Sequence, residues 1–367
     1  MTEQELSAYI QAIRPADEAA MEAARRRQAQ LAKPPGSLGQ LEEISIRLAG
    51  VTGQVCPAMG KCRVAVFAAD NGVVAEGVSC TPPAVTLQQA VNMTFRKTGM
   101  SAMAAAFGDD VSVVDVGIDG DVPPVGVLDR KVRRGTGDIA REDAMTRQQV
   151  LDAMAAGMEQ AARARADGVT ALGIGEMGIG NTTTSAAVLA ALTGADIEAV
   201  TGRGGGLTDE GFLRKKEVLR QALALHRPDG NDVIGVLAGV GGLDLAAMTG
   251  AFLGCAHERV PAAVDGFISI AAALCAVRLC PAVRDVLFLS HDSYEVGYRI
   301  AAETLGLQPC LRLGMRLGEG SGCPPLFRVL EGACGVMRGM ATFGEASIED
   351  SYLDEIRAVD AFTVEGA

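Results

Sequence analysis

Short apolar runs recur along the chain, and each ends at a glycine or a small polar residue before an alanine-rich, helix-forming segment. The apolar character within a run is continuous, which is typical of strands covered on both faces. Helical segments between successive strands imply a parallel sheet with right-handed crossovers. The sequence therefore predicts an α/β fold with a parallel, Rossmann-like sheet and flanking helices. The six candidate strands are Arg63–Ala69, Val111–Val116, Val169–Leu172, Val233–Ala238, Val286–Leu289 and Cys310–Leu313.

The chain length of 367 residues fits one large α/β unit with a small appendage. Hydrophobic residues make up 49% of the chain and charged residues 21%, so a sizeable core can form. We predict an α/β core over residues 31–330. The segments 1–30 and 331–367 are helical and lie outside the strand pattern, so we predict that they form a small helical subdomain or a dimer surface.

Charge and composition exclude several classes of partner. The net charge of −12 argues against nucleic acid, which requires clustered lysine and arginine. The longest apolar stretch, residues 267–277, is about half of the roughly 20 residues that cross a bilayer, so it indicates a buried helix and no membrane span. The N-terminus lacks a hydrophobic signal core, which predicts a cytoplasmic protein. The nine cysteines are scattered without zinc-ribbon spacing and there are only three histidines, so we expect no metal, and we expect no cofactor.

Two glutamates are framed by glycines directly after apolar runs. Residues 314–322 read Gly-Met-Arg-Leu-Gly-Glu-Gly-Ser-Gly around Glu319, and residues 173–181 read Gly-Ile-Gly-Glu-Met-Gly-Ile-Gly-Asn around Glu176. Glycine opens backbone conformations closed to other residues and lets a ligand approach closely. One such loop could equally be a tight turn with a solvent-facing acid. Two of them favour an enzyme that handles protons or positive charge.

Two helix starts suit an anion. Asn181 and the hydroxyl residues 182–185 precede an apolar helix, whose free N–H groups and positive dipole end face the loop of Glu176. The glycines 204–206 lead into a second helix that bears Lys215 and Lys216. Backbone donors next to a cation are typical of phosphate sites, so a phosphorylated substrate is predicted.

Each pattern also has an alternative interpretation. Residues 173–178 match the dinucleotide fingerprint GxGxxG, and Asp196 lies at the distance of a ribose-binding acid, so a dinucleotide-dependent oxidoreductase stays open. Glu176 argues against it, because a carboxylate in that turn would repel the pyrophosphate. Lys215 would by default be a solvated helix residue, and His291 a loop cap.

Eight ordered blocks resemble one known family over most of the chain, the nicotinate-nucleotide:dimethylbenzimidazole phosphoribosyltransferases of cobamide lower-ligand activation. The blocks are KPPGSLGQLE at 33–42, FAADNGVVAEGVS at 67–79, GIGEMGIGNTTTSAA at 173–187, TGRGGGLTDEG at 201–211, AAVDGFISIAAAL at 262–274, LSHDSYEVGYR at 289–299, LGMRLGEGSG at 313–322 and MATFGEASI at 340–348.

The resemblance implies transfer of phosphoribose from nicotinate mononucleotide to a benzimidazole-type nitrogen, with inversion at C1′, releasing nicotinate and forming an α-ribazole 5′-phosphate. It implies that Glu319 is the general base and that Glu176 is a second acid near the ribose. The residues that it places at the phosphoribose are Gly178, Asn181, Gly204, Gly205, Gly206, Lys215 and Ser293. The residues that it places at the incoming base are Ser79 and Gln88.

The chain departs from the commonest pattern of that family at three places. Asn71 stands where histidine is usual, Arg312 where aspartate is frequent, and SHDSYEVGY at 290–298 replaces a stretch more often read as SHLSAEPGH. Adenine or a phenol therefore stays possible as the acceptor. A protein that binds cobamide precursors without catalysis also stays possible as an alternative function. The resemblance implies a homodimer, or a heteromer in the case of phenolic acceptors.

Overall fold

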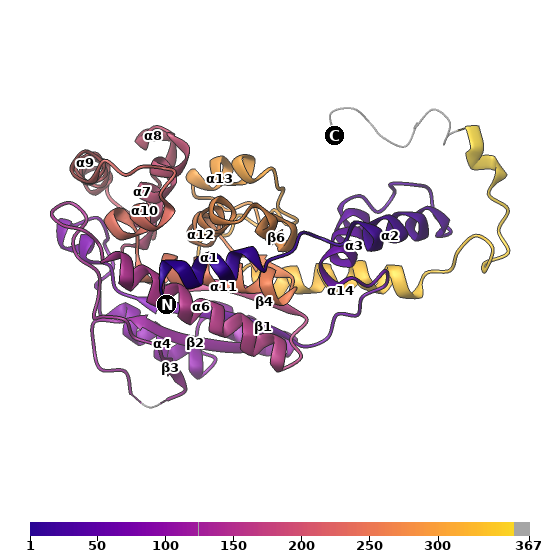
Figure 1. Cartoon of the computed structure of the whole chain (residues 1–367), viewed down its shortest axis with the longest axis horizontal. Coiled ribbons are helices and arrows are strands. Elements are labelled where there is room, and N and C mark those ends of the chain that lie inside the picture. The colour runs from indigo at the N-terminus through magenta and orange to yellow at the C-terminus, as the bar shows by residue number, and fades with distance from the viewer. Residues whose placement is uncertain (124, 356–367) are drawn as a thin grey trace.

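The computed structural model describes residues 1–123 and 125–355, and its centre is a parallel sheet of six strands in the order β3-β2-β1-β4-β5-β6 (Figure 1). This is the strand order of the Rossmann fold. The parallel, Rossmann-like sheet predicted from the sequence is thus confirmed. The strands are β1 Cys62–Ala69, β2 Asp110–Gly117, β3 Val127–Asp129, β4 Ala171–Met177, β5 Ala262–Val264 and β6 Leu287–Leu289.

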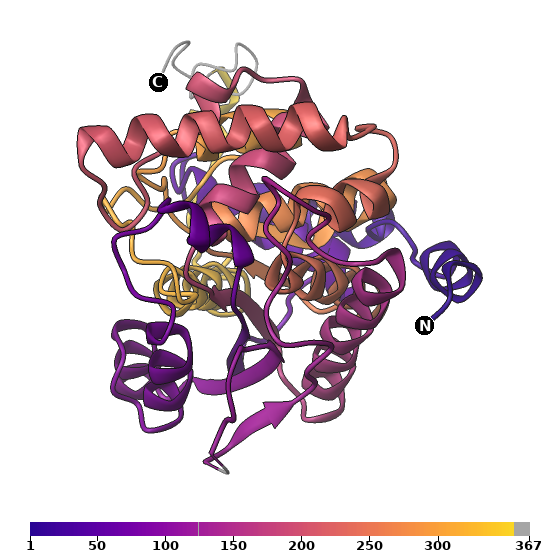
Figure 2. The ribbon, with the colours of Figure 1, turned by 90° about the vertical axis from the view of Figure 1, so that its left-hand side faces the viewer.

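Helices cover both faces of the sheet. One face carries α4 (Val85–Thr94), α5 (Gly99–Phe107) and α14 (Cys323–Gly339), and the other carries α6 (Arg147–Ala166), α11 (Leu243–Glu258) and α12 (Phe267–Leu279). The outer helices near the carboxyl ends of the strands are α7 (Asn181–Thr193), α8 (Ile197–Val200), α9 (Asp209–His226), α10 (Val233–Val240) and α13 (Gly297–Leu305). Figure 2 looks onto this end of the molecule, with α9 lying across it. Strands β1, β4, β5 and β6 are almost wholly buried, as their continuous apolar runs require.

Three of the predicted strands differ from the structure. Residues 233–238 belong to helix α10, whose start is capped by the Asp232 carboxylate accepting from the Gly235 N–H. This prediction was wrong because a short, wholly apolar run suits a buried helix as well as a strand. Residues 310–313 make only one parallel bridge, His291 with Leu311, beyond the end of β6. Strand β4 begins at Ala171 and continues to Met177, so Glu176 lies inside it. Short strands β3 and β5 were not predicted.

The N-terminal segment, predicted to be helical, forms two helices, α1 (Glu3–Gln11) and α2 (Glu18–Gln30), with Pro15 between them. Helix α1 packs on α11, whereas α2 packs on α3 (Gln40–Thr52). A second, smaller hydrophobic cluster joins α2, α3 and the end of α14 through Ala24, Leu31, Ile46, Ala49 and Met337. These helices project from the core in Figure 1.

The domain boundaries stay a prediction. Helix α14 runs across the proposed boundary at 330, and residues 356–367 of the proposed subdomain lie outside the described residues. The predicted buried helix at 267–277 is α12, whose residues 267–276 are buried. Within the described ranges, no helix is both long enough and apolar enough to span a membrane.

Candidate active site

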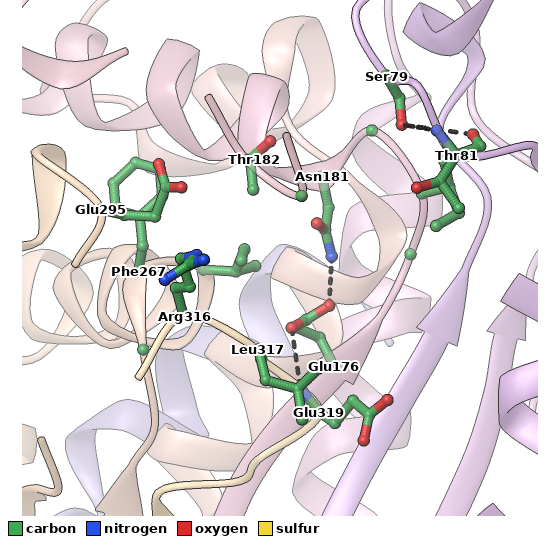
Figure 3. Close-up of a pocket in the computed structure, with 18 of the residues that line it drawn as sticks. Ser79, Thr81, Glu176, Asn181, Thr182, Phe267, Glu295, Arg316, Leu317 and Glu319 are labelled. Atoms are coloured by element: carbon green, nitrogen blue, oxygen red, sulfur yellow. Dashed lines mark hydrogen bonds between the residues drawn. The ribbon is translucent and has the colours of Figure 1, made fainter. Parts of the chain in front are cut away.

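A cavity of about 250 Å³ opens at the carboxyl ends of the central strands (Figure 3). In open parallel sheets this is where ligands bind. Loops after β1, β4, β5 and β6 line it, together with the loop that precedes α14. The predicted residues among its lining are Ser79, Glu176, Gly178, Asn181, Gly204, Gly205, Gly206, Ser293 and Glu319. The structure thus brings together residues spread over more than 200 positions of the sequence.

Glu176 projects from the end of β4, at the centre of the sheet. Its side chain accepts a hydrogen bond of 2.5 Å from the Asn181 amide, and its other oxygen accepts a weak one of 3.4 Å from the Glu319 N–H (Figure 3). Burial and the nearby Asp244 carboxylate raise the pKa of Glu176 to about 8. Glu176 is therefore mostly protonated at neutral pH in the empty site, and a bound cation would favour its ionised form.

Glu319 projects from a turn with an unusual backbone. Its φ is 64°, between Gly318 at 84° and Gly320 at 80°, so three successive residues are left-handed. Such a conformation is costly for a residue with a side chain, and it recurs at functional sites. The carboxylate points away from Glu176 in Figure 3 and accepts hydrogen bonds from the Met100 N–H at 3.3 Å and the Gln89 amide at 3.4 Å. Burial raises the pKa of Glu319 above its ordinary value.

The framing glycines pack the two glutamate segments against each other. A Cβ atom at Gly175 would lie 2.5 Å from the Gly320 nitrogen, and one at Gly318 would lie 2.5 Å from a carboxylate oxygen of Glu176. Gly173 similarly makes room for Cys323 at the start of α14. Gly173 and Gly175 both lie inside β4, so the GxGxxG match does not form the strand-to-helix turn of a dinucleotide site.

Asn181 holds the Glu176 carboxyl group from the first turn of α7. The same amide nitrogen lies 3.0 Å from the carboxylate of Asp244, which is fully buried at the start of α11. Burial raises the pKa of Asp244 to about 6. The Asn181 donors are thus occupied by two carboxyl groups, so in this structure Asn181 positions Glu176.

At one end of the cavity the glycines 204–206 lie beside the start of α7. Lys215 is fully buried, and its ammonium group donates to the Thr182 hydroxyl at 2.8 Å. Burial lowers the pKa of Lys215 to about 8, against the attraction of Glu295. Lys215 does not line the cavity itself but lies directly behind Gly204, where an added Cβ would be 3.8 Å from its nitrogen. The Gly206 N–H donates to the Arg203 carbonyl at 3.1 Å, and the Gly204 N–H interacts with the Glu295 carboxylate. The buried cation is therefore the main feature that makes this end suitable for a phosphate.

In Figure 3, Ser79 and Thr81 lie on the opposite side of the cavity from Glu295 and Phe267. A Cβ atom added at Gly205 would lie 3.9 Å from the Thr81 hydroxyl, so this side also borders the glycine loop. The Ser79 hydroxyl accepts from the Thr81 N–H at 3.1 Å. Val78, Val85 and Leu317 supply apolar lining. Gln88 is exposed on α4 and is not among the lining residues, whereas its neighbour Gln89 lines the cavity and contacts Glu319.

Four functional candidates were missed in the sequence: Gln89, Asp244, Asp265 and Arg316. Asp265 and Arg316 line the cavity, and Asp244 lies behind it. Asp265 directly follows β5, Ala262–Val264, but a run of three residues is too short to mark as a strand in the sequence. Asp244 carries no local signal, because its place depends on the packing of α11. Among the described residues, no cluster of histidine, cysteine and carboxylate side chains has the geometry to hold a metal.

Comparisons with known proteins show which family this chain resembles over its length. A family model described as phosphoribosyltransferase matches residues 13–348. Proteins named nicotinate-nucleotide–dimethylbenzimidazole phosphoribosyltransferase are similar in sequence. The one from Clostridium perfringens (strain 13) is 46% identical, with 93% of this chain and 94% of the relative covered. The one from Geobacter metallireducens is 45% identical, with 94% and 98% covered.

A solved structure is similar over nearly the same length. The crystal structure of CobT from Thermus thermophilus superposes with a TM-score of 0.88 at 44% identity, covering 91% of this chain and 100% of that one. A family model over most of the chain, close relatives over more than nine-tenths of it and a shared fold lead to one conclusion. The chain belongs to the phosphoribosyltransferase family.

Proposed function

We propose that this protein transfers 5-phosphoribose from nicotinate mononucleotide to a lower-ligand base of the 5,6-dimethylbenzimidazole type, with inversion at C1′. The products are nicotinate and an α-ribazole 5′-phosphate, a step of cobamide biosynthesis. The observation that carries the proposal is that one cavity holds two features. Glu319 supplies a buried carboxylate with a raised pKa, and residues 204–206 form an end suited to bind a phosphate. The names of the relatives supply the substrates.

Glu319 is the general base. The incoming base must lose its N–H proton as its other nitrogen bonds to C1′, whereas the pyridinium leaves as a neutral ring and needs no acid. A carboxylate removes a proton more effectively when its pKa approaches the working pH, and burial of Glu319 has this effect. Its fixed turn keeps the oxygen atoms at the cavity wall, as positioned catalysis requires.

Glu176 is the acid that faces positive charge. The nucleotide carries a cationic pyridinium, and positive charge spreads to C1′ as the glycosidic bond breaks. Glu176, Asp244 and Asp265 are all buried at this centre, so a bound cation compensates their mutual repulsion. Glu176 thus ionises as the nucleotide binds, and its negative charge stabilises the transition state.

The 5′-phosphate binds at Gly204, Gly205 and Gly206, with the charge of Lys215 behind them and the Ser293 hydroxyl beside them. Gly178 and Asn181 belong to the facing loop on the ribose side. The acceptor enters from the side of Ser79, where Val78 and Val85 provide apolar lining. Shape then determines much of the acceptor preference, because an aromatic bicycle has few polar atoms. Adenine and phenols are the acceptors to compare with dimethylbenzimidazole.

We further propose a cytoplasmic homodimer. Tyr294, Leu313 and Leu317 are exposed apolar residues, and Leu317 also lines the cavity, which supports self-association on this face. Sedimentation of the purified protein distinguishes the dimer from the monomer, and a monomer that is fully active contradicts it.

The direct test incubates the purified protein with nicotinate mononucleotide and 5,6-dimethylbenzimidazole and resolves the products by liquid chromatography with mass detection. Nicotinate and a ribazole phosphate should appear in equal amounts, and proton NMR of the ribose should show the α configuration. Nucleotide that stays intact with every acceptor class would refute the proposal.

A further inference from the structure

Asp265 lies at the end of β5, directly beneath the turn that carries Glu319. One carboxylate oxygen accepts from the Gly320 N–H at 3.0 Å, and the other accepts from the Gly322 N–H at 2.7 Å. Asp265 is only 2% exposed, so both bonds are shielded from water. The Asp265 carboxylate therefore fixes the backbone immediately after Glu319 through two hydrogen bonds.

The backbone of this turn requires hydrogen bonds of this kind to hold its conformation. Residues 318–320 are all left-handed, and Glu319 is the one member that carries a side chain. This backbone persists only where neighbouring groups hold it. The other contacts of Glu319 are longer, at 3.3 to 3.4 Å to Met100, Gln89 and Glu176. The two bonds to Asp265 are the shortest that reach this turn from another element.

We propose that Asp265 is the positioning residue that holds the turn at 318–322, and hence the Glu319 carboxylate, in the orientation needed for proton removal. This inference rests on the proposed role of Glu319 as the base. Asp265 acts through the backbone of the turn and through its charge. It does not itself take the proton.

The charge of Asp265 also acts on Glu319. The titratable groups that face Glu319 are Glu176 from β4 and Asp265 from the end of β5, while Gln89 and Thr98 contribute neutral hydrogen bonds. Burial raises the pKa of Asp265 itself, whereas His291 and the N–H groups of Gly320 and Gly322 favour its ionised form. When ionised, Asp265 contributes to raising the pKa of Glu319. His291 lies beside both Asp265 and Gly322, with its Nδ1 atom 3.9 Å from the Asp265 carboxylate. Removing the charge of Asp265 should therefore lower the pKa of Glu319.

A double-mutant cycle tests the inference with Asp265→Asn, Glu319→Gln and the combined variant. Asparagine keeps the size but loses one acceptor and the charge. We expect Asp265→Asn to lower kcat about 10²-fold in the wild-type background, the loss that misplacement by about 1 Å can cause. In the Glu319→Gln background it should lower kcat less than about threefold, because the group it positions is already gone. Equal losses in both backgrounds would overturn the inference.

The pH dependence of kcat gives a readout that a merely structural role would not move. In Asp265→Asn the acidic limb, which reports protonation of Glu319, should shift to lower pH, with little change in KM for the nucleotide. An unshifted limb contradicts the inference. Asp115→Asn is the matched control: Asp115 is also buried and accepts from the Gly117 and Ile118 N–H groups, but it lies outside the cavity lining. That variant should keep the wild-type kcat.

Hydrogen exchange of the wild-type protein tests the two hydrogen bonds to Asp265 even if Asp265→Asn does not fold. The amides of Gly320 and Gly322 should exchange slowly although they lie in a turn, and exchange as fast as in an exposed glycine loop would refute the inference. Failures are separable. Wild-type activity of Glu319→Gln refutes the base role itself, whereas an inactive Glu319→Gln with an active Asp265→Asn refutes only the positioning role.

Discussion

Glu176 and Glu319 lie in one cavity, but the chain supports them differently. Glu176 belongs to a central strand with neighbours on both sides, β1 and β5, and its backbone is regular. Glu319 lies in a left-handed turn held by hydrogen bonds from other elements. Glu176 contacts Asn181, behind which lies a further buried acid, while Glu319 contacts neutral donors.

The difference corresponds to two tasks. A group that stabilises positive charge on the substrate needs a fixed position and a pKa that the bound ligand can lower, and Glu176 has both. A group that removes a proton must reach a particular atom of the acceptor, and a turn can aim a side chain where a strand cannot. In the proposed reaction, a raised pKa would therefore allow ligand-induced ionisation of Glu176 and would increase the basicity of Glu319.

The largest expected effect is that of Glu319→Gln. We expect kcat to fall about 10²- to 10⁴-fold, the usual contribution of a general base, with little change in KM for the nucleotide. Initial rates of nicotinate release measure it. Glu303→Gln, an exposed glutamate on α13, is the control and should keep wild-type activity. Near-wild-type turnover of Glu319→Gln would place the base elsewhere.

Lys215→Met tests binding of the nucleotide phosphate separately from the catalytic step that involves the two glutamates. KM for nicotinate mononucleotide should rise roughly 10- to 100-fold, the range for a lost hydrogen bond to a charged group, with a smaller change for the riboside that lacks the phosphate. The control is Lys216→Met, since Lys216 pairs with Glu198 instead. An equal change for both substrates would remove Lys215 from the phosphate site.

Glu176→Gln should change how stability depends on pH. The pKa of Glu176 is about 8 in the folded protein, above its ordinary value of about 4.3. Between these values the folded state keeps a proton that the unfolded state releases, so the free energy of unfolding falls as pH rises. The fall should be smaller in Glu176→Gln, by on the order of a few kcal/mol over this interval. Urea unfolding at pH 5.5 and pH 8 measures it, and equal slopes would contradict the raised pKa.

The smallest expected effect is a change in the number of protons released when the nucleotide binds. If the pyridinium of the bound nucleotide ionises Glu176, nucleotide binding at pH 7 should release about half a proton to one proton more from the wild type than from Glu176→Gln. Calorimetry in buffers of different ionisation enthalpy measures the release. Equal release from both proteins would mean that Glu176 does not respond to the nucleotide.

The sequence predicted the sheet and the place of the site because both follow from local patterns. Continuous apolar runs marked β1, β2 and β6, and glycine-framed acids marked the cavity. The failures come from packing. Helix α10 and a buried strand share one pattern, and the three-residue strand β5 is too short to detect. Asp244 and Asp265 were missed because their partners lie more than 50 residues away in the chain.

The most direct test of the account is the pH dependence of kcat for the wild type and Glu319→Gln, with both substrates saturating so that protonation of the free acceptor has no effect. The wild type should lose activity toward acid as Glu319 is protonated, with a midpoint above the ordinary glutamate value, and Glu319→Gln should lack this acidic limb. The same acidic limb in both proteins would show that another group removes the proton.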